Sequence, residues 1–256
     1  MNDEDNDRQH PNVRLVGGGR DSDVIVALVA EFVADAAATC DRDGETPRIH
    51  ARLVLEDDDE ESVERFRSVL SLAGANVVVK AIVEGETFDE SAIHGADGLF
   101  VGGGLTPAYH DAFARISRLV RTLVTTGTPY LGFSAGAAIA AEHALIGGHS
   151  IGGVPICDEA AGEELADVTV VSGLGLVPFS VDVHAAQWGT VSRMIAAVGA
   201  GLLPSGVAID EHTAVHWRGG RTAPEAAVSG RGSAWHIARS TGSANSVIVN
   251  RLTGEH

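Results

Sequence analysis

The sequence is poor in cysteine and in basic residues. Two cysteines, Cys40 and Cys157, among 256 residues are too few for a disulfide framework, so we interpret both as thiols of a reducing compartment. The 18 lysine and arginine residues are outnumbered by 35 aspartate and glutamate residues, which gives a formal net charge of -17. Because such a surface repels phosphate backbones, it excludes general nucleic-acid binding.

Long hydrophobic runs are also missing. No apolar run reaches the roughly 18 residues of a membrane-spanning helix without glycine or charge. Residues 1–12 are polar and acidic, the reverse of a signal peptide. We therefore expect a cytoplasmic protein without membrane contact, with residues 1–12 as a disordered acidic tail and residues 13–256 as a single domain. The hydrophobic fraction of 45% is enough for a sizeable core.

Short apolar runs alternate with amphipathic segments over the first part of the chain. This alternation predicts an α/β fold with a mostly parallel sheet covered by helices on both faces. The expected strands are residues 13–16, 49–55, 76–82, 98–101 and 130–133, and the expected helices are residues 21–38, 60–73, 109–125 and 135–144.

The C-terminal third of the chain has a different character. Short β-like runs occur there, and one further helix is expected at residues 188–198. We interpret these runs as strands added at the edge of the sheet. They are residues 168–171, 207–209, 214–217 and 246–249.

One motif carries recognisable chemistry, Gly132-Phe133-Ser134-Ala135-Gly136. A Gly-x-Ser-x-Gly pattern between an apolar strand and a helix is typical of a nucleophile elbow, in which a sharp turn presents the serine oxygen. The flanking glycines relieve the crowding that this turn creates. The alternative interpretation is a serine that caps a helix within a tightly packed turn.

A nucleophilic serine needs a base, and eleven histidines are available. His184 is favoured because it ends the apolar run 176–183 and precedes a helix, and sites in parallel sheets are built at strand ends. His143 and His149 are disfavoured, since we expect His143 on the helix after the elbow, pointing away. The other candidates that remain open are His212, His216 and His236.

Four segments together resemble the cyanophycinase and dipeptidase E family of serine peptidases. No single segment is decisive, but their order and spacing match across roughly residues 13 to 217. The segments are Leu99-Phe100-Val101-Gly102-Gly103-Gly104, Gly132-Phe133-Ser134-Ala135-Gly136-Ala137, Gly173-Leu174-Gly175-Leu176 leading to Asp182-x-His184, and Gly206-Val207-Ala208-Ile209-Asp210-Glu211-His212-Thr213-Ala214.

The resemblance implies a three-layer, flavodoxin-like α/β sandwich similar to class I glutamine amidotransferase domains. It implies Ser134 as the nucleophile, His184 as the base, and backbone N–H groups of Ala135 and Gly104 as an oxyanion hole. The implied reaction is amide hydrolysis of small peptides through an acyl-enzyme, with aspartyl or β-aspartyl residues on the acyl side. No metal or cofactor is implied.

The chain departs from the family in the residues around the base. The family has an acidic residue about fifteen to eighteen positions after the serine, but residues 149–152 contain no carboxylate. Glu142 is the first candidate to replace it, with Asp158 and Glu159 as alternatives. Arginines that follow the histidine in cyanophycinases and bind a substrate carboxylate are missing too. Our candidate substrate-binding residues are Gly103, Thr106, Asp182, Trp188 and Arg193.

Three interpretations of the function remain open. The first is a serine peptidase or amidase, and the second is a catalytically impaired, amidotransferase-like binding protein that kept the elbow as structure. The third is an α/β-hydrolase esterase, suggested by Gly-x-Ser-x-Gly alone, with its base near the C-terminus at a residue such as His236. The sequence leaves the existence of a homodimer undecided.

Overall fold

A computed structural model describes residues 11–40, 44–57, 59–219, 226–240 and 246–252. The prediction of an acidic tail falls, except for residues 11 and 12, outside the described residues. Asn12 belongs to the folded part, because its carbonyl oxygen accepts a hydrogen bond from the N–H of Tyr130 at 2.9 Å.

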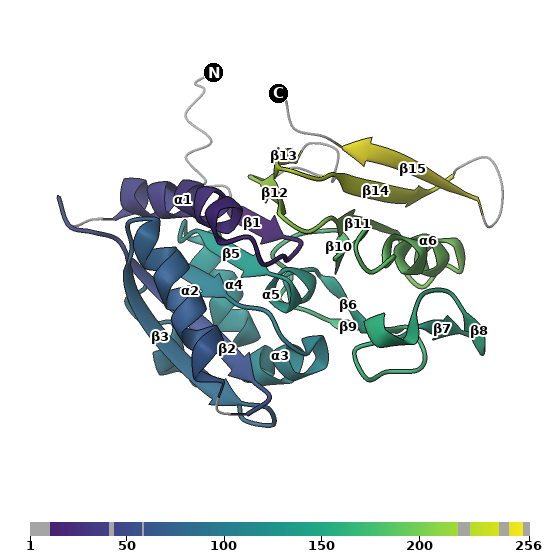
Figure 1. The fold of residues 1–256 in the computed structure, drawn as a ribbon, viewed down its shortest axis with the longest axis horizontal. Helices are drawn as coiled ribbons and strands as arrows, with labels where there is room; N and C mark the ends of the chain where they lie inside the picture. The colour runs from purple at the N-terminus through teal and green to yellow at the C-terminus, as the bar shows by residue number, and fades with distance from the viewer. Residues whose placement is uncertain (1–10, 41–43, 58, 220–225, 241–245, 253–256) are drawn as a thin grey trace, which may run out of the picture.

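The centre of the molecule is a seven-stranded sheet with the strand order β13-β12-β1-β5-β4-β2-β3 (Figure 1). The five strands from β1 to β5 run parallel, and β12 and β13 join antiparallel beside β1. The bounds are β1 (Val13–Val16), β2 (Arg48–Leu55), β3 (Asn76–Val83), β4 (Gly98–Val101), β5 (Tyr130–Phe133), β12 (Thr213–Trp217) and β13 (Ala227–Gly230).

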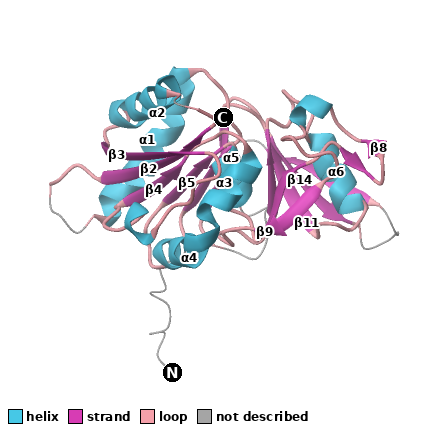
Figure 2. Ribbon diagram, turned by 90° about the horizontal axis from the view of Figure 1, so that it is seen from below, coloured by secondary structure: helices cyan, strands magenta, loops and turns pink. Residues whose placement is uncertain are grey.

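Helices cover both faces of this sheet (Figure 2). One face packs against α1 (Ser22–Thr39) and α2 (Glu60–Leu72) around Phe32, Phe66 and Phe100. The other face packs against α3 (Thr106–Phe113), α4 (Ser117–Thr125) and α5 (Ala135–Ile139). The mostly parallel, three-layer architecture predicted from the sequence is confirmed. None of the described helices is long and apolar enough to cross a membrane.

A second, four-stranded sheet has the order β10-β11-β14-β15, with α6 (Val191–Gly199) packed on it. The prediction of C-terminal edge strands is therefore right for one of the four runs. β12 extends the central sheet, whereas the run at 168–171 becomes β9 (Thr169–Ser172), which pairs with β6 (His143–Gly147). The runs at 207–209 and 246–249 belong to the second sheet, because β11 pairs with β10 and β15 pairs with β14. Its strands are β10 (Ser180–Val183), β11 (Ser205–Ile209), β14 (Ala234–Arg239) and β15 (Val247–Leu252).

Two of the expected helices have different ends. The segment 109–125 is α3 and α4, joined by the 3₁₀ turn η2 (Ala114–Ile116). The helix expected to reach residue 144 ends at Ile139, because β6 (His143–Gly147) pairs with β9 (Thr169–Ser172). Tertiary pairing thus overrides the helix propensity of the alanine run. The remaining short elements are η1 (Glu90–Ala92), η3 (Glu159–Ala161), β7 (Ser150–Ile151) and β8 (Val154–Pro155).

Candidate active site

Ser134 follows β5 directly and has the backbone conformation of a nucleophile elbow. Its φ of 52° and ψ of -111° lie where non-glycine residues are strained, at a cost on the order of 1–3 kcal/mol. The flanking glycines are required by close packing: a Cβ on Gly132 would lie 2.4 Å from the Gly136 carbonyl oxygen, and one on Gly136 would lie 2.3 Å from that of Val101. The strand, the glycines and α5 together force the serine out of the sheet.

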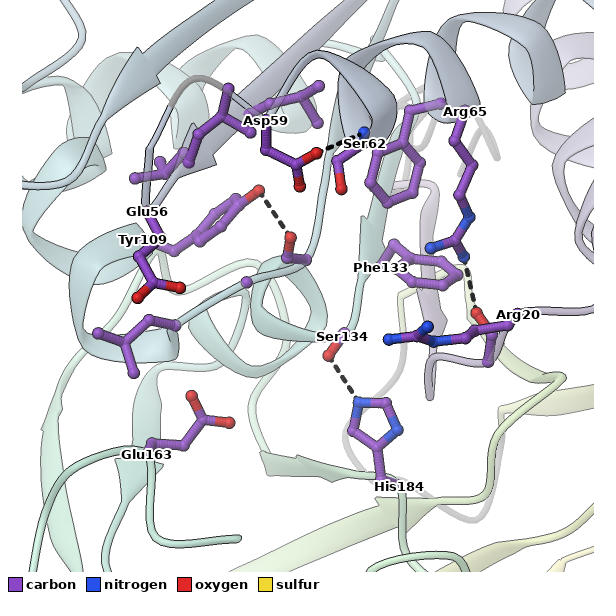
Figure 3. A pocket seen from close by; sticks show the side chains of 18 of the residues that line it. Arg20, Glu56, Asp59, Ser62, Arg65, Tyr109, Phe133, Ser134, Glu163 and His184 are labelled. Atoms are coloured by element: carbon purple, nitrogen blue, oxygen red, sulfur yellow. Dashed lines mark hydrogen bonds between the residues drawn. The ribbon is translucent and has the colours of Figure 1, made fainter. Parts of the chain in front are cut away.

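His184 is the histidine that the structure brings to this serine. It follows β10, and its Nε2 lies 2.8 Å from Ser134 Oγ (Figure 3). Of the other candidates, His212 lines the same cavity, but its Nε2 accepts hydrogen bonds from the N–H groups of Arg20 and Asp21. His216 and His236 lie in β12 and β14, and His143 begins β6 and is not helical.

The second nitrogen of the imidazole meets a carboxylate that the sequence analysis did not select. Nδ1 of His184 lies 2.8 Å from Oε1 of Glu211. Glu142, the residue expected here, is exposed on the turn between α5 and β6, where its N–H donates to the Val177 carbonyl. Asp158 caps η3, and no ion pair joins Glu142, Asp158 or Glu159 to His184 among the described residues.

The sequence placed Glu211 in a segment of the family resemblance, but it did not show that this residue lies next to His184. Glu211 stands in a segment that carried the family resemblance, two residues after the apolar run that forms β11. β10 and β11 are parallel neighbours, with Val183 opposite Ile209, so the residues that follow them lie side by side. Which strands are neighbours is a property of the fold, and spacing along the chain does not reveal it.

The imidazole of His184 is held between two surfaces. A Cβ on Gly18 would lie 2.2 Å from its Cε1, so only glycine leaves room there. The indole of Trp188 stacks on the imidazole, with ring centroids 4.0 Å apart and planes 9° apart. Burial lowers the pKa of His184 below its ordinary value of 6.5, while the hydrogen bond and the charge of Glu211 act in the opposite direction. The ring is thus kept neutral and fixed in orientation, as a general base requires.

Backbone N–H groups lie near the serine on its other side. A Cβ on Gly103 would lie 2.9 Å from Ser134 Cβ, and the hydroxyl of Tyr109 donates to the Gly103 carbonyl at 3.2 Å. Within the described chain, the N–H groups of Gly103, Gly104 and Ala135 donate to no backbone carbonyl. Free N–H groups at a glycine turn and at a helix start are suited to an oxyanion. Oxyanion roles for Gly104 and Ala135 stay predictions.

Ser134 and His184 open into a cavity of about 760 Å³. Gly103 and Trp188, two of the predicted substrate-binding residues, line it, and Trp188 is 45% exposed. Arg20 and Arg65 face it from one side of Ser134, and Glu163 lies on the other side (Figure 3). The cavity has the size of a site for a small ligand and is charged at both ends.

The other three predicted substrate-binding residues have structural roles. Arg193 and Asp182 are buried and bind each other through two hydrogen bonds of 2.7 and 2.9 Å. Arg193 also donates to the carbonyls of Gly148 and Ala161. Thr106 is buried at the start of α3, where its N–H donates to Glu163 at 2.8 Å. None of the three lines the cavity, because each is paired within the protein.

No group of three or more His, Cys, Asp or Glu side chains that could hold a metal ion occurs in the described part of the chain. The arrangement consists instead of a hydroxyl, an imidazole and a carboxylate in series. Such a series can remove a proton from the serine as it attacks a carbonyl carbon.

Two solved structures resemble this chain in fold. The chain has a TM-score of 0.62 and 14% identity to a peptidase from an acI-B1 actinobacterium, covering 97% of this chain and 96% of that chain. It has a TM-score of 0.52 and 18% identity to a putative peptidase E protein from Listeria monocytogenes, covering 95% of this chain and 100% of that chain. At these identities the likeness concerns the fold.

Among curated protein sequences, no significant match was found. The model of peptidase family S51 matches residues 54–223, more than half of the 256 residues. The matched range includes the elbow, His184 and Glu211. The chain therefore belongs to peptidase family S51, the family of dipeptidase E and cyanophycinase.

Proposed function

We propose that this chain is a serine peptidase or amidase that cleaves amide bonds of small peptides through an acyl-enzyme on Ser134. One observation carries the proposal, the continuous series from Ser134 Oγ through both nitrogens of His184 to Glu211, with both distances at 2.8 Å. In this series the serine O–H donates to Nε2, and the Nδ1–H donates to the carboxylate.

The reaction follows from that arrangement. Ser134 Oγ attacks the substrate carbonyl carbon as Nε2 takes its proton, and the resulting oxyanion is bound by the N–H of Ala135 and an N–H of the Gly103–Gly104 turn. The imidazolium then gives the proton to the leaving nitrogen, and the C–N bond breaks. A water molecule attacks the acyl-enzyme by the same route and releases Ser134.

The cavity of about 760 Å³ favours a dipeptide or a similarly small amide over a folded protein. The family resemblance implies aspartyl or β-aspartyl residues on the acyl side, and we extend this preference to the present chain. Arg193, one of the predicted substrate-binding residues, is hydrogen-bonded to Asp182 and is not available to bind a substrate carboxylate.

The two alternative functions lose the observations that motivated them. The impaired binding protein rested on a missing acid, and a carboxylate at hydrogen-bond distance from His184 answers that objection. The esterase interpretation rested on a base near the C-terminus, whereas His236 is in β14, where it pairs with β11 and β15.

A fluorophosphonate probe tests the proposal without knowledge of the substrate. We expect covalent labelling of the wild-type chain at Ser134, no labelling of Ser134→Ala, and strongly reduced labelling of His184→Ala. Hydrolysis of a dipeptide library should disappear in Ser134→Ala. A wild-type chain that neither reacts with the probe nor cleaves any dipeptide would contradict the proposal.

A further inference from the structure

Two arginines from different elements meet on one wall of the cavity. Arg20 follows the glycine turn after β1, and Arg65 lies on α2, yet both line the cavity that contains Ser134 (Figure 3). Nothing in the sequence pattern joined them, because they are separated by α1, β2 and the first turn of α2.

The guanidinium of Arg65 is held in place on two sides. Its Nη2 donates to the carbonyl of Gly19 at 2.7 Å, which ties it to the turn that carries Arg20. Its Cζ lies 5.1 Å from the ring centroid of Phe66 and 5.7 Å from that of Phe133, the residue before Ser134. This anchoring fixes a cation beside the nucleophile while leaving other N–H groups of the fork available.

The charge of this wall is not balanced within the protein. In the described chain, neither Arg20 nor Arg65 forms an ion pair with a carboxylate, whereas Arg14, Arg193 and Arg231 each do. Burial and the nearby charge of Arg20 both lower the pKa of Arg65. Two converging guanidinium groups repel each other unless an anion lies between or beside them, and a carboxylate fits their planar donor geometry.

The position of the pair identifies the part of the substrate that would reach it. Three directions lead away from the attacked carbonyl carbon: its nitrogen must face His184, and its oxygen must face the turn beneath Tyr109. In Figure 3, Arg20 and Arg65 lie on the Phe133 side of Ser134, and Glu163 lies on the other side. We assign the acyl side to this pair, and the amidated dipeptide in the test below separates it from the leaving side.

We propose that Arg20 and Arg65 form a subsite for a carboxylate on the acyl side of the scissile amide, which makes them the specificity-determining residues of this chain. This inference rests on the proposed peptidase function. It gives the role of the arginines missing after His184 to two arginines from the turn after β1 and from α2. Glu163, on the far side of Ser134, would repel a carboxylate placed there.

The test compares two nearly isosteric dipeptides, Asp-Leu and Asn-Leu, with the wild-type chain and the variants Arg20→Met and Arg65→Met. Loss of a charge-assisted hydrogen bond corresponds to about a 10- to 100-fold change. We expect each variant to lose this much kcat/KM for Asp-Leu and little for Asn-Leu. Arg65→Lys should recover only part of the loss, because it keeps the charge but not the fork.

Arg67→Met is the matched control, since Arg67 lies on the same helix but pairs with Glu64 and does not line the cavity. The inference is overturned if the ratio of kcat/KM for Asp-Leu to kcat/KM for Asn-Leu is the same in Arg20→Met and Arg65→Met as in the wild type. So does a loss that disappears when the C-terminal carboxylate of Asp-Leu is amidated, because the pair would then bind the leaving side. Fluorophosphonate labelling of Ser134 in every variant separates these results from a failure of the proposed function.

Discussion

Glu211 Oε1 lies 2.8 Å from Nδ1 of His184, on the side of the imidazole away from Ser134. This carboxylate follows the end of β11 and stands 77 positions after the serine in the chain (211 − 134). The resemblance implied an acid only about fifteen to eighteen positions after the serine. The carboxylate that faces His184 therefore comes from a segment more distant in the chain than the resemblance implied.

Replacing this carboxylate tests its role directly. In Glu211→Gln the amide can donate to Nδ1, which would favour the tautomer with the proton on Nε2 and remove the acceptor for the serine proton. We expect kcat to fall by on the order of 10⁴. Glu142→Gln is the control and should leave kcat unchanged, since Glu142 is exposed and does not contact His184. The opposite result would restore Glu142 as the acid.

The pH profile should reflect the burial of His184. The base must be neutral, and burial lowers the pKa of His184 below 6.5, so the acid limb of kcat/KM should be centred below pH 6.5. Glu211 opposes this shift, because its charge favours the imidazolium. The acid limb of Glu211→Gln should therefore lie at a still lower pH. An acid limb centred above pH 6.5 in the wild type would contradict this account.

Alanine substitutions at two glycines distinguish the effect of a contact with His184 from the effect of backbone strain. Gly18 and Gly74 have φ values of 104° and 95°, but a Cβ on Gly18 would lie 2.2 Å from His184 Cε1, whereas one on Gly74 would meet nothing within 4 Å. Each alanine substitution should cost about 1–2 kcal/mol of folding stability. Only Gly18→Ala should also displace the base.

We expect a loss of about 100-fold in kcat/KM for Gly18→Ala and no loss for Gly74→Ala. Steady-state kinetics measures kcat/KM of both variants, and urea unfolding measures their folding stability. Equal activity of the two variants would show that the contact between Gly18 and the imidazole is not required.

The stack between Trp188 and His184 should contribute modestly to catalysis. Aromatic pairs contribute about 0.5–1.5 kcal/mol beyond area burial, so Trp188→Ala should lower kcat roughly 2- to 10-fold, and Trp188→Phe should retain most of it. Leu202→Ala serves as the control, because Leu202 is similarly exposed at 46% but does not line the cavity. If Trp188→Ala raised KM alone, the indole would act on substrate binding and not on the base.

Arg193 should behave as a structural residue. Its ion pair with Asp182 is buried, with side chains that are 4% and 2% exposed, so Arg193→Met should destabilise the fold by about 3–5 kcal/mol. The double variant Asp182→Asn with Arg193→Met should recover part of this, because it leaves no charge buried alone. Urea unfolding of the two single variants and the double variant measures the coupling. Full additivity would mean that the two residues act independently.

The local features of the site could be read from the sequence. The pattern of residues 130–136 predicted both β5 and the elbow, because the strand, the crowding at Ser134 and the need for Gly132 and Gly136 are effects of neighbours in the chain. His184 could be found in the same way, at the end of a buried strand. The resemblance then gave the family.

The tertiary structure decided which charged groups meet. Glu211 reaches His184 because β10 and β11 are parallel neighbours in the second sheet. Arg193 cannot bind substrate because it is buried in an ion pair with Asp182, which joins α6 to β10. Arg20 and Arg65 line the same cavity because Arg65, on α2, donates a hydrogen bond to the carbonyl of Gly19, the residue before Arg20. The sequence by itself determined the nucleophile and its turn, since these depend on local backbone sterics. The acid beside His184, the pair of arginines on the cavity wall and the buried arginine depend on distant segments packing together.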